Sequence, residues 1–450
     1  MPLIKPTPGA STTDREILAL AVPALGALVA EPVFLLVDSA LVGHLGRVPL
    51  AGLGLASAVL QTVVGLMVFL AYGTTPAVAR RLGAGDRAGA ISLGVDGTWL
   101  ATALGVALGA IGFLAAPYLV GLFSAASEVT QQASAYLRVA MIGLPAMLIV
   151  YAATGLLRGL QDTRTPLAVA VAGFIANAGL NGFFIYGLHL GVVGSAVGTD
   201  VAQWGMVAAY VVVIVRRARA EHASLRPHAR GVLGVAGAGW WLLIRTAALR
   251  AALLLATWAA TRLGSVELAG WQLVMTVFNT LAFALDALAI AAQALIGHGL
   301  GASDVDRVRA VLRRCLQWGI GAGVVLGAVV LVLSPWLGRA FTSDPHVLAV
   351  LPVGVALIAV AAPLDGFVFV LDGVLIGAGD ARYLALTGLL NLSCFVPCAV
   401  LVAVLVPGSG LPSWLGFALL AASFAFIYLG ARALTLGLRA RSPRWLVTGA

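Results

Sequence analysis

Long apolar stretches alternate with short polar segments along almost the whole chain. Reading the pattern from the N-terminus gives twelve such stretches, at 17–44, 48–79, 89–116, 131–157, 166–187, 192–215, 237–261, 267–297, 310–333, 347–376, 384–405 and 412–438. A helix of about 20 apolar residues crosses the ~30 Å hydrocarbon core of a bilayer, and every stretch reaches that length. The pattern therefore predicts an all-α polytopic membrane protein with twelve transmembrane helices.

Composition agrees with a membrane protein and excludes an ordinary soluble domain. Hydrophobic residues make up 61% of the chain and charged residues 10%, whereas soluble domains average roughly 25% charged residues. The opening segment "MPLIKPTPGASTTDRE" lacks the basic start and short apolar core of a signal peptide. We therefore expect the first apolar stretch to be a spanning helix.

Basic residues are distributed unevenly between the two sides of the predicted helices. With the connections assigned alternately, one side carries all but four of the 27 Lys and Arg residues, the four being Arg47, Arg138, Arg262 and Arg339. Cytoplasmic loops are enriched in Lys and Arg, so both termini and the linker "RRARAEHASLRPHAR" at 216–230 are predicted to be cytoplasmic. We expect a multi-pass protein of the cell (plasma or inner) membrane. The net charge of +9 then reflects orientation and attraction to anionic lipid, and we expect no nucleic-acid partner.

The sequence also repeats itself at a constant offset of 218 residues. "LGRVPLAG" at 45–52 aligns with "LGSVELAG" at 263–270, and "GLLRGLQDTR" at 155–164 aligns with "GVLIGAGDAR" at 373–382. Each copy contains six predicted spans, an even number, so both copies have the same orientation in the membrane. Two such copies are related by an axis along the membrane normal.

The repeat predicts a division into two lobes. We expect an N-lobe at 1–218 with helices 1 to 6, a basic cytoplasmic linker at 219–235, and a C-lobe at 236–450 with helices 7 to 12. Within each lobe, glycine-containing turns end in an aspartate, at Asp86, Asp162, Asp304 and Asp380. Two of these turns read "GAGD", as in intramembrane aspartyl proteases, but they lie beside arginines at the interface. We interpret all four as helix ends that meet water on the cytoplasmic side.

Several acidic residues remain inside the predicted spans: Glu31, Asp38, Asp200, Asp286, Asp365 and Asp372, with Asp96 closer to the interface. Glu31 and Asp38 are seven residues apart, about two helical turns, and therefore share one face, as do Asp365 and Asp372. Apart from Arg245 and Arg250, no basic residue lies at a comparable depth. Burial disfavours the ionised form of a carboxyl group, so such groups can take up a proton near neutral pH. Function is the default interpretation of intramembrane acids, and the alternative is structural hydrogen bonding between helices.

Other kinds of chemistry find little support. The single lysine, Lys5, cannot belong to a phosphate-binding loop, so the chain does not hydrolyse ATP on its own. Cys394 and Cys398 are one turn apart without histidine or acidic neighbours, and the six histidines are scattered over loops and span ends. We expect no cofactor, no metal site, no catalytic residues and no enzymatic activity, and we expect transport driven by H⁺ or Na⁺.

Four segments in the same order resemble the MATE (multidrug and toxic compound extrusion) family, specifically its DinF-like branch. They are "EPVFLLVDSALVGHLG", "GLLRGLQDTRTP", "NAGLNGFFIYGLHLGVVGSAVGT" and "FVLDGVLIGAGD". The resemblance implies twelve helices in two lobes around a cavity that opens alternately to each side. It also implies export of organic compounds, often cationic xenobiotics, in exchange for protons or sodium.

The resemblance further implies a cation-coupling site in the N-lobe. Asp38 matches the family's coupling carboxylate, Asn177 and Asn181 match a polar pair on helix 5, and Thr199 matches a hydroxyl on helix 6. Thr154 on helix 4 stands where relatives can carry asparagine. Asn181 stands where several relatives carry aspartate, and the loss of that acid disfavours a full sodium site, because hard cations prefer anionic oxygens. We therefore expect proton coupling.

Alternatives remain open for some of these residues. Asp200 follows Thr199 and could supply the missing acid, although adjacent helical positions diverge by about 100 degrees. Asn177 and Asn181 could simply bond neighbouring helices, and the glycines of "GVVGSAVG" are typical of close helix packing. Glu31 could be a proton relay or a structural partner of Asp38.

Substrate binding is predicted to involve the C-lobe. Asp286, Asp365 and Asp372 should line the cavity and help to hold small organic cations. A lipid-linked precursor flippase of the same superfamily is the alternative function, and it would need several basic residues for pyrophosphate. A membrane-embedded enzyme is a further alternative and would need a catalytic pair or a metal cluster. We expect a monomer.

Overall fold

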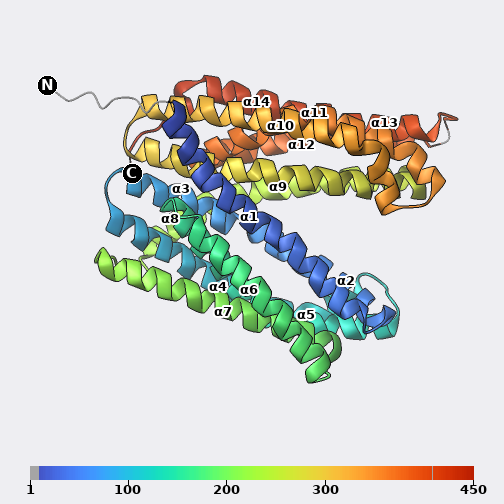
Figure 1. The fold of residues 1–450 in the computed structure, drawn as a ribbon, viewed down its shortest axis with the longest axis horizontal. Helices are drawn as coiled ribbons and strands as arrows, with labels where there is room; N and C mark the ends of the chain where they lie inside the picture. The colour runs from blue at the N-terminus through green and yellow to red at the C-terminus, as the bar shows by residue number, and fades with distance from the viewer. Residues whose placement is uncertain (1–9, 408, 450) are drawn as a thin grey trace. The chain divides into compact units, whose positions relative to one another are not determined.

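The computed structural model describes residues 10–407 and 409–449, and these are helical with short connections (Figure 1). Within the described residues, twelve helices are long and apolar enough to cross a membrane. The predicted fold class is therefore confirmed: the chain is an all-α, multi-pass membrane protein with twelve spanning helices. Each of the twelve spans is longer than the apolar stretch predicted from the sequence.

The helices follow the predicted order. Their bounds are α1 Ala10–Gly43, α2 Arg47–Met67, α3 Phe69–Gly83, α4 Arg87–Gly121, α5 Ser127–Gly159, α6 Arg164–Gly182, α7 Gly191–Ala220, α8 Ala229–Leu263, α9 Ser265–Gly301, α10 Val305–Phe341, α11 Pro345–Gly377, α12 Ala381–Leu405, α13 Ser413–Ala422 and α14 Leu429–Arg441. Three of the twelve spans are irregular. The second is divided at Val68 into α2 and α3, the fifth ends in the π-helical turn η1, Phe183–Gly187, and the last contains η2, Ser423–Tyr428, between α13 and α14.

The chain divides into two compact units, which we describe separately. The first unit consists of Val22–Gly239 with Gly301–Ser303 and Gly449, and the second consists of Trp240–Leu300 and Asp304–Thr448 with the start of α1 up to Ala21. The start of α1 thus groups with the second half of the chain, whereas we predicted it in the N-lobe.

Ion pairs and hydrogen bonds account for this placement of the start of α1. The carboxylate of Asp14 accepts hydrogen bonds from Arg314 Nε at 2.5 Å and from Trp318 Nε1 at 2.9 Å, both on α10. Two helical turns earlier on α10, Arg307 pairs with Glu16 at 3.1 Å. The two acids therefore hold the first turns of α1 to α10.

The same close helix packing occurs within each of the two units, and it explains why glycines recur at equivalent positions. In the first unit, a Cβ on Gly105 of α4 would lie 2.5 Å from Pro145 Cα of α5. In the second unit, a Cβ on Gly323 of α10 would lie 2.7 Å from Pro363 Cα of α11. Both residues of the second pair lie 218 positions after those of the first. The sequence repeat is therefore also a repeat of helix packing.

The backbone has the same conformation at the four turns that end in Asp86, Asp162, Asp304 and Asp380. The residues directly before them, Gly85, Gln161, Ser303 and Gly379, all have positive φ. Each aspartate amide then donates to the carbonyl five residues earlier, as in a Schellman helix end. Asp86 and Asp304 also cap the following helices, accepting from the amides of Gly89 at 2.7 Å and Arg307 at 3.0 Å. The turns therefore start helices as well as end them, which our sequence interpretation did not include.

The predicted linker packs on α4 of the first unit. Asp96 is 3% exposed and accepts a hydrogen bond of 2.8 Å from the amide of His228. Trp99 Nε1 donates to the carbonyl of Leu225 at 3.2 Å, and the amide of Ser224 donates to Ser92 Oγ at 3.0 Å. Asp96 thus holds the linker to α4, and its position near the membrane interface stays a prediction.

Candidate functional site

Asp38 lies on α1 of the first unit and is 5% exposed. Its Oδ1 accepts a hydrogen bond of 2.8 Å from Asn181 Nδ2 on α6 and one of 2.5 Å from Ser195 Oγ on α7. Both donors are neutral, and within the described residues no arginine, lysine or histidine pairs with this carboxylate. Among the described residues, Asp38 is thus bound only by neutral groups, which come from two other helices.

Glycines bring α7 close enough to place these donors. A Cβ on Gly198 would lie 2.1 Å from Asn181 Oδ1, and a Cβ on Gly194 would lie 2.8 Å from the carbonyl carbon of Phe184. Phe184 belongs to η1, which begins two residues after Asn181. The glycines of the "GVVGSAVG" segment are therefore packing residues, as we predicted.

A second hydrogen bond joins the same two helices one turn away. Asn177 Nδ2 of α6 donates to Thr199 Oγ1 of α7 at 3.0 Å, and both side chains are buried. Within the described residues, Asn177 Oδ1 and Asn181 Oδ1 are buried without a hydrogen-bond partner. Asn181 Nδ2 and Ser195 Oγ thus donate to Asp38, whereas the two asparagine side-chain oxygens accept no hydrogen bond from a described residue.

Asp200 faces a different helix from Thr199. It is 8% exposed, and its Oδ1 lies against α5, where a Cβ on Gly143 would come within 1.9 Å. This follows from the rotation of about 100 degrees between adjacent helical residues. The buried Tyr136 of α5 lies within electrostatic reach of both Asp38 and Asp200 and interacts with Ser195. It therefore adjoins the Asp38 cluster through Ser195.

Two predicted residues are not brought into this cluster. Thr154 Oγ1 bonds the Tyr210 hydroxyl at 3.0 Å, and Tyr210 lies within electrostatic reach of Arg158 and Asp162, at the end of α5. Glu31 is partly buried on α1, two turns before Asp38. The residues that the structure brings together are Asp38, Asn177, Asn181, Ser195 and Thr199, with Tyr136 and Asp200 adjoining.

The predicted acids of the second unit have varied surroundings. Asp372 of α11 forms an ion pair with Arg245 of α8, whose Nε donates to Oδ1 at 3.1 Å, and Arg432 Nη2 of α14 is 3.6 Å from the same oxygen. Asp365 is 1% exposed, and both its oxygens lack a hydrogen-bond partner among the described residues. Asp286 is partly buried on α9.

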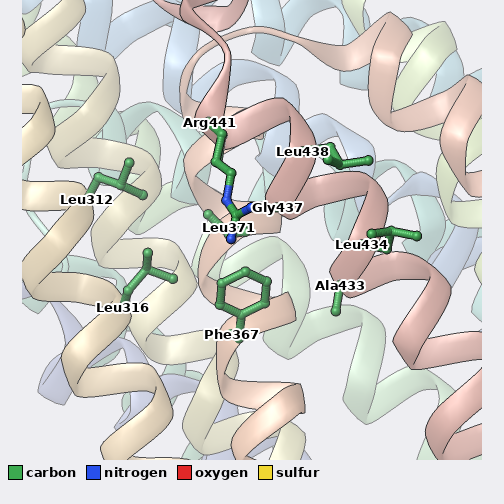
Figure 2. Close-up of a pocket in the computed structure, with 10 residues that line it drawn as sticks. Leu312, Leu316, Phe367, Leu371, Ala433, Leu434, Gly437, Leu438 and Arg441 are labelled. Atoms are coloured by element: carbon green, nitrogen blue, oxygen red, sulfur yellow. The ribbon is translucent and has the colours of Figure 1, made fainter.

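A groove of about 320 Å³ also lies in the second unit, between α10, α11 and α14. Figure 2 shows leucines and Phe367 around it, with the Arg441 side chain extending among them. Its lining is otherwise apolar and includes none of the predicted site residues. It therefore belongs to a different part of the unit from the buried acids.

Comparison with known families decides the identity. The MatE family model matches residues 23–183 and matches again at 245–405, one copy in each half of the chain. The chain belongs to the MATE family. The two matched ranges also agree with the internal repeat in the sequence.

Named relatives and solved structures agree with this assignment. The chain is 32% identical to Protein DETOXIFICATION 44, chloroplastic, of Arabidopsis thaliana, over 85% of this chain and 75% of the relative. It is 27% identical to DNA damage-inducible protein F of Escherichia coli, over 82% of each chain. A mutant of the Vibrio cholerae MATE transporter VcmN has the same fold, with a TM-score of 0.86, 21% identity and coverage of 97% of this chain and 99% of that one.

Sequence reasoning missed three residues of this MATE protein. Ser195 lies one turn before Thr199 on α7, and that spacing could have indicated a shared face. Tyr136 has no local signal, because its interaction with Ser195 depends on α5 packing against α7. Arg432 lies close to the end of the last predicted span, where we counted it among the cytoplasmic charges.

Proposed function

We propose that this MATE protein exports small organic compounds in exchange for protons that bind at Asp38. The supporting observation is the setting of the Asp38 carboxylate, which is buried and held by the neutral donors Asn181 and Ser195. A carboxyl group in this setting changes between its ionised and protonated forms without breaking an ion pair. Its charge can therefore follow the conformation of the transporter.

The donors around Asp38 favour protons over sodium. A sodium ion on Asp38 would require oxygen ligands, but Asn181 turns its amide nitrogen and Ser195 its hydroxyl hydrogen towards the carboxylate. Sodium coupling is the alternative, and the unused side-chain oxygens of Asn177 and Asn181 are the observation in its favour. An ion that bound there would have to turn both amides.

Other features complete the proposal. We expect a transporter rather than an enzyme, without a cofactor, acting as a monomer in the cell (plasma or inner) membrane with both termini in the cytoplasm. Organic cations remain the expected substrates, with Asp286, Asp365 and Asp372 as candidate binding residues. A lipid-linked precursor flippase is the alternative function. Two buried arginines of the second unit, Arg245 and Arg432, favour it, but Arg245 already pairs with Asp372.

The test uses the full chain in liposomes with the cationic dye ethidium. An imposed pH gradient should drive dye movement by the wild type, and Asp38→Asn should abolish that movement while equilibrium binding of the dye in detergent persists. Asp306→Asn is the matched control, because Asp306 is exposed at the start of α10. Movement by Asp38→Asn at the wild-type rate would assign coupling to another residue, with Glu31 or Asp200 next in line.

Two further arms address the ion and the orientation. A sodium gradient imposed at equal pH should leave the dye in place, and dye movement under that gradient would assign sodium as the coupling ion. A C-terminal epitope tag should be protected from protease in right-side-out vesicles. Digestion of the tag in intact vesicles would reverse the predicted orientation.

A further inference from the structure

The apolar groove between α10, α11 and α14 carries a single positive charge. Its volume of about 320 Å³ falls within the range of roughly 300–1,000 Å³ that ligand sites occupy. Among the ten described residues that line it, Arg441 alone is charged, and leucines contribute to the lining from all three helices. The groove therefore combines an extended apolar surface with one cationic group.

The groove starts at helix ends that lie on one side of the membrane. α10 begins at Val305, α11 ends at Gly377 and α14 ends at Arg441. Because successive spans run in opposite directions, these three ends share the side that we predict to be cytoplasmic. Leu316 lies eleven residues after Val305, about 16 Å at a rise of 1.5 Å per residue, which is about half of the ~30 Å hydrocarbon core. The lining therefore extends through no more than about one leaflet.

The surface around the groove is apolar and exposed. Leu434 and Leu438 of α14, which line the groove, are 63% and 57% exposed. On α10, Ile320 and Val324 continue the face of Leu316 at intervals of four residues, and they are 39% and 52% exposed. Polar side chains mark surfaces that face a water-filled cavity, so an apolar exposed surface at this depth contacts acyl chains. An occupant of the groove would therefore enter from the lipid.

Arg441 directs its charge towards this apolar surface. It is exposed and lies in the last turn of α14. Helical side chains point towards the N-terminus of their helix, so the Arg441 side chain turns back from the helix end and extends among the lining residues (Figure 2). Within the described residues it has no hydrogen bond or ion pair, whereas Arg439, two residues earlier, donates to Asp380 at 2.6 Å. The Arg441 guanidinium is therefore available to bind an anion.

A second arginine follows the same face of α10. Arg309 precedes Leu312 by three residues and Leu316 by seven, so the three share a face of the helix. Arg309 is exposed, and among the described residues it too has no hydrogen bond or ion pair. It lies four residues after Val305, close to the same helix ends as Arg441. The positive charge is thus concentrated where lipid headgroups would lie.

We propose that the groove binds one anionic phospholipid, with an acyl chain along the leucines and the phosphate held by Arg441. Arg309 adds a second positive charge at the same end. A guanidinium can donate to two phosphate oxygens at once, and basic sites between helices at the cytoplasmic surface are typical of anionic lipid binding. A soluble phosphate compound would leave the apolar lining uncovered, so a lipid is the better match. This site is independent of the exported compound and of the coupling ion.

The test compares dioleoyl phosphatidylglycerol, which is anionic, with dioleoyl phosphatidylcholine, which is zwitterionic. The two lipids have the same acyl chains and differ in the charge of the headgroup. Native mass spectrometry of the full chain in detergent, titrated with each lipid, gives the affinity for the first lipid retained. The wild type should bind phosphatidylglycerol roughly tenfold more tightly, and Arg441→Gln should remove most of that preference.

Matched variants separate charge at the groove from charge elsewhere. Arg219→Gln is the control, because Arg219 is exposed in the last turn of α7 and does not line the groove. It removes the same charge and should leave the preference intact. Arg441→Lys keeps the charge but not the two-pronged geometry, so it should retain only part of the preference.

Two further variants alter the groove without changing charge. Ala433→Phe fills it, and Leu434→Gln makes an exposed part of its lining polar. Both should weaken binding of the two lipids together, because the acyl chain loses its contacts. Thermal unfolding checks that each variant is folded, and Leu434→Gln provides the test if the larger side chain at Ala433 disturbs the packing.

Several outcomes would overturn the inference. Equal affinity of the wild type for the two lipids would do so, as would a preference that persists in Arg441→Gln. An equal loss of preference in Arg219→Gln would show a general attraction to positive charge. Unchanged lipid binding by the folded groove variants would place the lipid elsewhere. Displacement of phosphatidylglycerol by equimolar glycerol phosphate would assign the groove to a soluble phosphate compound instead.

Discussion

Ser195 donates a hydrogen bond of 2.5 Å to Oδ1 of Asp38, although the two residues are 157 positions apart in the chain. The same oxygen accepts from Asn181 at 2.8 Å, so a single carboxylate joins α1, α6 and α7. A proton on Asp38 would weaken both bonds, because each is strongest towards an ionised acceptor. The protonation state of Asp38 would thus alter how three helices are held together, which is what a coupled transporter requires.

The first prediction concerns Ser195. Ser195→Ala should reduce transport driven by a pH gradient by about tenfold or more, because a hydrogen bond to a charged group contributes about 1.5–3 kcal/mol and every 1.4 kcal/mol corresponds to tenfold. Ser195→Thr keeps the hydroxyl and serves as the matched variant. The measurement is the initial rate of dye movement in liposomes at several pH values. Equal rates for the alanine variant and the wild type at every pH would remove Ser195 from the coupling site.

The second prediction uses the close approach of α6 and α7. Gly198→Ala would place a Cβ 2.1 Å from Asn181 Oδ1, so the asparagine must move away from its present position beside Asp38. Transport should fall by about tenfold or more, although alanine is the better helix former by roughly 1 kcal/mol. Gly205→Ala on the same helix is the control, since nothing lies within 4 Å of its added Cβ. Similar transport by the two variants would contradict the prediction.

The sequence allowed the fold to be predicted because membrane spans depend mainly on length and apolar composition. The repeat was visible for a related reason: both halves need the same glycines and prolines where helices cross, as at Gly105 and Pro145. The division of the second span at Val68 and the π-helical turn at Phe183–Gly187 were not predictable. The π-helical turn lies against Gly194 of α7, and such a contact between helices leaves no local signature.

The candidate site was predictable only in part, for a similar physical reason. Asp38, Asn177, Asn181 and Thr199 followed from family positions, and the structure brings them together. Ser195 lies within a glycine-rich segment that indicates helix packing. Its hydrogen bond to Asp38 depends on where α1 lies, which the sequence does not indicate. In the second unit, the sequence suggested unpaired acids, whereas Asp372 has partners on two other helices. Ion pairs between distant helices cannot be inferred from hydropathy.

The third prediction is a pH dependence of stability that arises at the turn before α6. Burial opposes ionisation of Asp162, but hydrogen bonds from Thr165 and the charge and hydrogen bond of Arg217 outweigh it, so the pKa of Asp162 lies below its usual 3.8. Since the pKa is lower in the folded state, the stabilisation is complete above about pH 4 and is lost as the pH falls through the folded-state value.

Thermal unfolding in detergent between pH 6 and pH 3 measures this effect. The wild type should lose more stability over that range than Asp162→Asn, whose side chain does not titrate. Asp306→Asn should follow the wild type, because Asp306 is exposed on the first turn of α10. Parallel curves for the wild type and Asp162→Asn would show that Asp162 does not contribute.

The last prediction separates two acids that share one face of α11. Asp372→Asn leaves Arg245 and Arg432 nearly buried without their shared carboxylate, and breaking a buried pair in this way costs about 3–5 kcal/mol. Asp365→Asn breaks no hydrogen bond among the described residues, so its unfolding temperature should stay at or above that of the wild type.

The double variant Asp372→Leu with Arg245→Leu provides the decisive comparison. It removes the closer pair together and should recover part of the stability lost in Asp372→Asn, because apolar replacement of a buried pair is often neutral, whereas Arg432 still lacks its carboxylate. Dye binding by Asp365→Asn then tests recognition of cations without a folding defect. Relative to the wild type, this variant should lose more affinity for a cationic dye than for a neutral one. If Asp372→Asn unfolded at the wild-type temperature, the ion pair with Arg245 would contribute nothing to the fold, and Asp372 would be available to hold substrate.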